Sequence, residues 1–147
     1  MQEKGIVTPK VLVAGESREK GRLLTSYLIT EAETKSCEIK HILLSIESEK
    51  DLVDLFLNIS EAFRKMHDAG IVHGDLVPSN LYLKNNKVGF WDLDSCNLVD
   101  SPINNTYREY MFNKFINAAK KTLNDNKNFQ TNSNLWTKLH KILSGPL

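Results

Sequence analysis

The chain has 147 residues, which is enough for one domain of ordinary size and too few for two. Nineteen basic against eighteen acidic residues leave a formal charge of +1, so the overall charge gives no support to a nucleic-acid partner. No apolar run approaches the roughly 18 residues that a membrane span needs, and residues 1–10 hold Glu3, Lys4 and Pro9 where a signal peptide is apolar. We therefore expect a cytoplasmic protein.

The first third of the chain predicts two strands. Apolar residues run from Val11 to Val13 and from Leu23 to Thr30, and the charged segment 15–21 between them begins and ends with glycine. This pattern is typical of two strands joined by a polar hairpin turn.

An amphipathic helix is predicted over residues 49–69. Ser48 with Asp51 forms a capping box, and Gly70 provides a left-handed end. The apolar positions recur every three or four residues. They are Leu52, Leu55, Phe56, Ile59, Ala62, Phe63 and Met66.

Residues 71–80 are too rich in Gly, Pro and Asp for regular structure, and a two-residue hairpin follows them. Apolar runs flank Asn85-Asn86, and paired Asn tolerates the positive φ angles of a primed turn. With the turn at these residues, paired positions sum to 171, so Asn80 faces Trp91 and Asp92 follows directly.

The remaining chain predicts a loop over 95–105 and two helices. A capping box at Thr106 and Glu109 opens the first helix, an Asn-rich linker spans 124–134, and the last helix runs over 135–143 before Gly145 and Pro146. The predicted buried face of the first helix consists of Tyr107, Tyr110, Met111, Phe115, Ala118, Ala119 and Leu123.

The residues that carry chemistry are Asp75, Asn80 and Asp92, which the hairpin register brings to one end of a small ribbon. Two carboxylates and an amide are oxygen ligands that suit Mg²⁺. In phosphoryl transfer, Asp75 would position the attacking hydroxyl and accept its proton, while Asn80 and Asp92 would hold the metal against nucleotide phosphates. The alternative is a polar turn in which Asp and Asn satisfy backbone donors.

The other titratable residues of interest give weaker signals. His41, His67 and His140 have no partners at metal-ligand spacing, so we interpret them as core or surface residues. Cys37 and Cys96 lie far apart in a chain without secretory features, which predicts two reduced thiols in small buried positions.

Residues 73–80 read HGDLVPSN and resemble the HRDLxxxN catalytic loop of the protein-kinase-like superfamily, with Asp92 in the place of the DFG aspartate. Within that superfamily the chain most resembles the lipopolysaccharide kinases of the Kdo/WaaP family. The matching segments are GIVTPK at 5–10, LTSYLITE at 24–31, MHDAG at 66–70 and DLD at 92–94. The resemblance covers residues 5 to about 120.

The resemblance implies an α+β, protein-kinase-like fold with a mostly helical large lobe and a two-stranded remnant of the small lobe. Residues 1–35 would form the small-lobe strands and the hinge, with Glu31, Ala32 and Glu33 beside the adenine. Residues 36–147 would form the large lobe, including the catalytic loop 73–80 and a metal-site hairpin over 81–94. His73 would brace the catalytic loop from beneath rather than act as a base.

Several departures separate the chain from protein kinases. Gly74 replaces the arginine that meets a phosphorylated activation loop, and no Ala-Pro-Glu triplet follows Asp92. Val77 stands where many protein kinases carry a phosphate-contacting lysine, so that charge has to come from elsewhere. Residues 1–30 contain neither a Gly-rich loop nor a strand lysine in its expected context.

The resemblance implies transfer of phosphate from ATP, with Mg²⁺, to a sugar hydroxyl of the lipopolysaccharide-core type. Two alternatives stay open: a catalytically silent kinase-like binding module, and a small-molecule kinase of the aminoglycoside or choline type, which shares the HGDL opening. We also expect self-association or a partner chain over the exposed top of the large lobe. Peripheral membrane contact is implied by the family alone.

Overall fold

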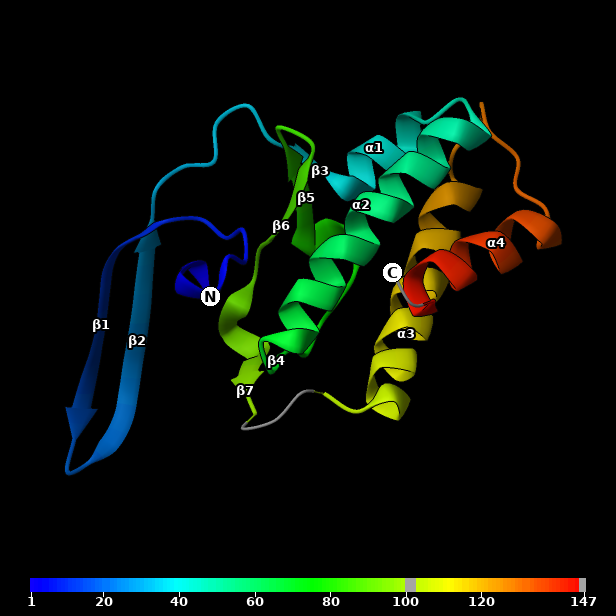
Figure 1. Ribbon diagram of the computed structural model, residues 1–147. Coiled ribbons are helices and arrows are strands. Elements are labelled where there is room, and N and C mark those ends of the chain that lie inside the picture. The colour runs from blue at the N-terminus through cyan, green and yellow to red at the C-terminus, as the bar shows by residue number, and fades with distance from the viewer. Residues whose placement is uncertain (100–102, 146–147) are drawn as a thin grey trace.

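The computed structural model describes residues 1–99 and 103–145, and its helices and small sheets confirm the predicted α+β class (Figure 1). The helices are α1 (Ile39–Ser45), α2 (Glu49–Asp68), α3 (Asn105–Asn124) and α4 (Ser133–Ser144). The strands are β1 (Val11–Glu19), β2 (Arg22–Thr30), β3 (Cys37–Glu38), β4 (Ile71–His73), β5 (Leu81–Lys84), β6 (Lys87–Phe90) and β7 (Cys96–Leu98). Short 3-10 turns cover Gln2–Lys4, Pro78–Asn80 and Leu93–Ser95.

Strands β1 and β2 form a long antiparallel hairpin, here called the arm. The predicted turn over 15–21 is wrong, because both strands continue to a tight turn at Lys20 and Gly21, which have positive φ angles. Charged residues are tolerated within β1 since the arm is exposed to solvent, and Arg18 donates to Glu16 at 2.6 Å within the same strand.

The arm stands apart from the helices (Figure 1). Its large apolar side chains retain 46% to 57% of their surface exposed. They are Val11, Leu12, Val13, Leu23, Leu24, Tyr27, Leu28 and Ile29. A two-stranded hairpin that buries so little apolar surface is only marginally stable alone. The arm therefore leaves a large apolar surface exposed to solvent.

Residues before the arm pack on the helical part of the chain. Ile6 is 3% exposed and belongs to the hydrophobic core. The carbonyl of Val7 accepts a hydrogen bond from Phe90 N, which extends the β6 edge, and Lys4 Nζ donates to Ala69 O at the end of α2. Residues on both sides of the predicted domain boundary at residue 35 therefore contribute to the same hydrophobic core.

Helix α2 confirms the predicted helix. Ser48 Oγ accepts from Asp51 N at 3.1 Å, and Gly70 takes the left-handed conformation at φ 70°. Leu52, Leu55, Phe56, Ile59, Phe63 and Met66 are buried as expected. Their face forms the centre of the core.

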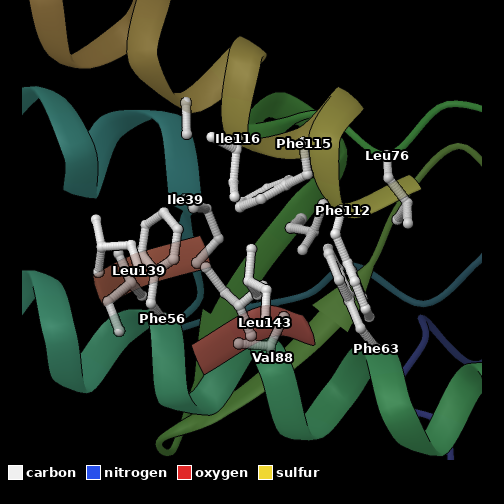
Figure 2. Close-up of a cluster of buried hydrophobic side chains, with 14 of the residues drawn as sticks. Ile39, Phe56, Phe63, Leu76, Val88, Phe112, Phe115, Ile116, Leu139 and Leu143 are labelled. Carbon is white, nitrogen blue, oxygen red and sulfur yellow. The ribbon is translucent and has the colours of Figure 1, made fainter. Parts of the chain in front are cut away.

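Helices α1, α3 and α4 close over this face of α2, together with β6 (Figure 2). The ring of Phe63 stacks with that of Phe112, with centroids 6.0 Å apart, and with that of Phe90, at 6.2 Å. Ser60 Oγ and Arg64 Nη2 both donate to the carbonyl of Ile142, which fastens α4 to α2. These tightly packed helices form a rigid support for the short strands and loops at the edge of the core.

The start of α3 differs from the prediction. Asn104, rather than Thr106, is the N-cap, and its Oδ1 accepts from Tyr107 N at 2.9 Å. Asn104 has the extended backbone that a cap requires, whereas Thr106 already lies inside the helix. Tyr110, predicted on the buried face, is 61% exposed, and Phe112 and Ile116 are buried in addition to Phe115.

The linker between α3 and α4 is anchored by a buried asparagine. Asn126 is 6% exposed and its Nδ2 donates to the carbonyls of Leu43 and Ile46, both at 2.9 Å. These carbonyls belong to the end of α1, where they have no partner within the helix. Helix α4 begins after Asn132 and ends at Gly145, and Pro146 lies outside the described residues.

Candidate active site

The hairpin β5–β6 has the register predicted from the sequence. Leu81 pairs with Phe90, and Asn85 and Asn86 have φ angles of 50° and 58°. The rung beyond the strands is also present, since Trp91 N donates to Asn80 O at 2.7 Å. Asp92 directly follows Trp91, so its backbone begins next to the end of the 73–80 loop.

A second, unpredicted pairing positions the start of that loop. Strand β4 pairs with β7, so the predictions of irregular structure from residue 71 and of a loop from residue 95 are wrong at these positions. Residues 100–102 of the predicted loop lie outside the described residues. Gly74 N donates to Ser95 O at 3.3 Å, and a Cβ at Gly74 would lie 2.9 Å from Ser95 Cβ. Close packing of these two segments explains the glycine.

His73 is completely buried and both ring nitrogens are hydrogen-bonded. Nδ1 accepts from Asp75 N at 3.2 Å, so the proton of a neutral ring lies on Nε2, which donates to Trp91 O at 2.9 Å. The imidazole thus links the 73–80 loop to the residue before Asp92, and neither nitrogen is left to take a substrate proton.

Asp75 and Asn80 are brought together by direct contact. Asn80 Nδ2 donates to Asp75 O at 3.0 Å and to Asp75 Oδ2 at 3.2 Å. A backbone carbonyl can only accept, so the amide nitrogen must face Asp75. The side-chain oxygen of Asn80 is then the atom available to a cation.

Asp92 has left-handed backbone angles, with φ 50° and ψ 63°. Asp is among the non-glycine residues that most often adopt this conformation. The conformation ends the extended chain of β6 and turns it into the short 3-10 turn over Leu93–Ser95. The carboxylate of Asp92 is consequently presented at the exposed end of the hairpin.

One neighbour of the site is not among the residues that the sequence analysis singles out. Lys114 Nζ, on α3, donates to Asp75 Oδ1 at 3.0 Å and to Gly74 O at 2.9 Å. The only signal for it in the sequence is indirect: Val77 leaves the loop without the cation found there in many protein kinases.

The acids after β6 impose a negative field on their surroundings. Burial, together with the charges of Asp92 and Asp94, raises the pKa of the Cys96 thiol to about 11. Both cysteines are free thiols, as predicted, but Cys37 is exposed rather than buried. A cation placed near Asp92 would meet two carboxylates at this end of the hairpin.

The donor set at this end fits Mg²⁺ in kind. Mg²⁺ usually takes one or two protein carboxylates and fills the rest of its shell with water and phosphate oxygens. One amide oxygen from Asn80 and one carboxylate from Asp92 match that requirement. Across residues 1–99 and 103–145, no cluster of three or more His, Cys, Asp or Glu side chains suits a metal, so a site held by protein side chains alone is not indicated.

The segment proposed as a hinge connects the arm to β3. Glu31 N donates to Lys10 O and continues the arm's ladder, while Ala32 is exposed. Glu33 contacts the hairpin β5–β6 instead: its Oε2 accepts a hydrogen bond from Lys84 Nζ of β5 at 2.6 Å. The segment is therefore tied to the hairpin that carries Asn80.

Residues 1–131 match the sequence pattern of the lipopolysaccharide kinase (Kdo/WaaP) family. The chain belongs to this family. Membership confirms the resemblance drawn from residues 5–10, 24–31, 66–70 and 92–94.

The fold agrees with that of a family member. The chain superimposes on WaaP, solved in complex with acyl carrier protein, with a TM-score of 0.74 and 14% sequence identity. The match covers 97% of this chain and 61% of the WaaP chain. At this identity the likeness shows a shared fold.

A shorter match links the chain to a second group of proteins. It is 43% identical over 47 residues to a probable bifunctional tRNA threonylcarbamoyladenosine biosynthesis protein of Methanosphaera stadtmanae, covering 32% of this chain and 9% of that protein. The chain thus spans less than two thirds of either relative. None of its described helices is long and apolar enough to cross a membrane.

Proposed function

We propose that the chain transfers a phosphoryl group from ATP, with Mg²⁺, to a sugar hydroxyl of the lipopolysaccharide-core type. The observation that carries the proposal is the contact of Asn80 with Asp75, at 3.0 and 3.2 Å, one backbone hydrogen bond away from the residue preceding Asp92. This arrangement supports two adjacent functions, proton acceptance at one carboxylate and metal binding at the other.

In this proposal Asp75 accepts a hydrogen bond from the acceptor hydroxyl and takes its proton as the new phosphorus–oxygen bond forms. The bond between the γ-phosphorus of ATP and the oxygen that bridges to the β-phosphate breaks, and ADP leaves. The Asn80 side-chain oxygen and the Asp92 carboxylate would hold Mg²⁺. When bound, Mg²⁺ neutralises charge on the phosphate oxygens of ATP. His73 keeps the two ends of the site together through its hydrogen bonds to both.

The division of the chain follows from the same proposal. The arm and the hinge, up to residue 35, correspond to small-lobe strands, and residues 36–147 correspond to the large lobe with its loop 73–80 and hairpin 81–94. Glu31, Ala32 and Glu33 would lie beside the adenine. The Glu33–Lys84 ion pair supports this placement, because it fixes the hinge relative to β5.

The proposal is tested by transfer of radiolabelled γ-phosphate from ATP to lipopolysaccharide core oligosaccharide. We expect Asp75→Asn and Asp92→Asn to lower kcat by about 100-fold or more, since each removes a charge that acts in the transition state. Asp54→Asn, at an exposed position of α2, is the matched control and should leave the rate unchanged. Equal rates in all four proteins would disprove the assignment.

A second candidate function is a kinase-like nucleotide-binding module without turnover. It is supported by the state of Asp75, whose two carboxylate oxygens already accept hydrogen bonds from Lys114 and Asn80. Calorimetric titration with Mg²⁺ and ADP distinguishes the two, because binding without any transfer favours the module. Aminoglycoside and choline acceptors in the same transfer assay test the small-molecule alternative.

We also propose that the arm pairs with the arm of a second copy of this chain. Each strand of the arm has one unpaired edge, and both of its faces are apolar. Two arms related by a two-fold axis form a four-stranded sheet, which covers one of the two open edges of each arm. Light scattering after size exclusion should show a dimer that Leu24→Lys disrupts and Leu57→Lys, at an equally exposed site on α2, does not. A monomeric wild-type chain at high concentration contradicts this proposal.

A further inference from the structure

The most unusual neighbour of the 73–80 loop is a lysine from a distant helix. Lys114 lies on α3, 39 residues after Asp75, and its ammonium group contacts both the carboxylate of Asp75 and the carbonyl of Gly74. The two side chains are 35% and 49% exposed, so substrate has access to the pair.

An exposed ion pair usually contributes little to stability, since solvent screens it and both side chains lose freedom. This pair differs in its geometry. Lys114 holds Oδ1 of Asp75 while Asn80 holds Oδ2, so donors from two separate elements fix the rotation of the carboxylate. The additional hydrogen bond to Gly74 O fixes the ammonium group itself.

The charge of the region gives a second reason to assign a role to this lysine. Asp75, Asp92 and Asp94 lie on the loop and at the hairpin end, and the loop itself carries Val77 where a cation is found in many protein kinases. Lys114 brings a positive charge to Asp75 from outside the loop.

We propose that Lys114 is the positioning residue for Asp75: it supplies from α3 the cation that the 73–80 loop lacks and holds the carboxylate in the orientation that receives the acceptor hydroxyl. The inference rests on the proposed phosphotransferase function. Small misplacements of a reacting group cost large factors in rate, so loss of this contact acts on kcat more than on nucleotide binding.

The test compares Lys114→Met, Lys114→Arg and Lys121→Met. Lys121 is an exposed lysine two turns further along the same helix and serves as the control. We expect Lys114→Met to lower kcat of phosphoryl transfer by about 10- to 100-fold with KM for ATP within about twofold of wild type. Lys114→Arg should recover a large part of the loss because it retains the charge and its donors.

A double variant shows whether Lys114 acts through Asp75. In an Asp75→Asn background, Lys114→Met should cause no further loss of kcat, because the group that it positions is already disabled. A further loss of the full 10-fold or more would show that Lys114 acts independently, and the positioning role would be rejected. Unchanged kcat in Lys114→Met would reject it as well.

A measurement without turnover separates this inference from the proposed function. In ¹H–¹⁵N spectra of the chain alone, Lys114→Met should shift the amide signals of Gly74 and Asp75 strongly, Lys114→Arg weakly, and Lys121→Met not at all. If wild type transfers no phosphate, the proposed function fails while these spectra still decide the contact. If the spectra do not respond to Lys114→Met, the inference fails whatever the activity.

Discussion

His67 predicts a specific loss of stability in mild acid. The residue is completely buried among aromatic rings, 5.6 Å from the ring of Phe112, and neither ring nitrogen has a hydrogen-bond partner among the described residues. Burial, together with the positive charge of Arg108 and against an opposing effect of Asp68, lowers its pKa from 6.5 to about 4. His67 is therefore neutral in the folded protein at pH 5, whereas the unfolded chain binds a proton there.

The size of the effect follows from the two pKa values. Because the unfolded state binds more protons between pH 6.5 and about 4, stability is complete above that interval, falls as the pH falls through it, and levels off below it. The full difference corresponds to roughly 3 kcal/mol, of which about 2 kcal/mol is lost between pH 7.5 and pH 5.

Urea denaturation of wild type and His67→Leu at both pH values isolates this contribution from that of the carboxylates. Leucine has a similar volume and does not titrate, so the variant should lose about 2 kcal/mol less than wild type over the same pH change. His41→Gln, at an exposed position, should behave as wild type. Equal pH dependence of wild type and His67→Leu would refute the reasoning.

Three further predictions concern packing and reactivity. Replacing Asn126 with Ala leaves two carbonyls at the end of α1 without their donor and should lower the free energy of unfolding by about 2 to 4 kcal/mol in urea. Gly89→Ala places a Cβ 2.3 Å from Tyr82 Cζ, so calorimetry should show a loss of about 1 to 3 kcal/mol. Iodoacetamide at pH 8 should modify exposed Cys37 well before Cys96, whose raised pKa keeps it protonated; similar rates by mass spectrometry would contradict this.

The sequence predicts those features correctly that depend on residues close together in the chain. The paired Asn85-Asn86 turn fixes the register of β5 and β6 locally, and that register alone places Asp92 beside the end of the 73–80 loop. The apolar spacing of α2 is equally direct, since it depends only on the period of one helix.

The missed features depend on contacts between distant segments. The three-residue strands β4 and β7 are too short to show a pattern, and their pairing arises only when both segments are held at the edge of the core. Lys114 reaches Asp75 because α3 packs against the turn Pro78–Asn80, a contact between distant segments that no local pattern encodes. The start of α3 was predicted two residues late, at Thr106, because the extended backbone that makes Asn104 the cap is not encoded in the local sequence pattern.

In the proposed site, the amide nitrogen of Asn80 donates to Asp75 and the amide oxygen binds the cation, and this limits which residues can replace Asn80. An acid at this position would attract a cation more strongly but would have no hydrogen to give to the carbonyl of Asp75. An alanine would offer neither. Because two hydrogen bonds to Asp75 hold the nitrogen of Asn80, the orientation of its side-chain oxygen is fixed. In the proposed function, a magnesium ion would therefore bind this oxygen without having to order the side chain first.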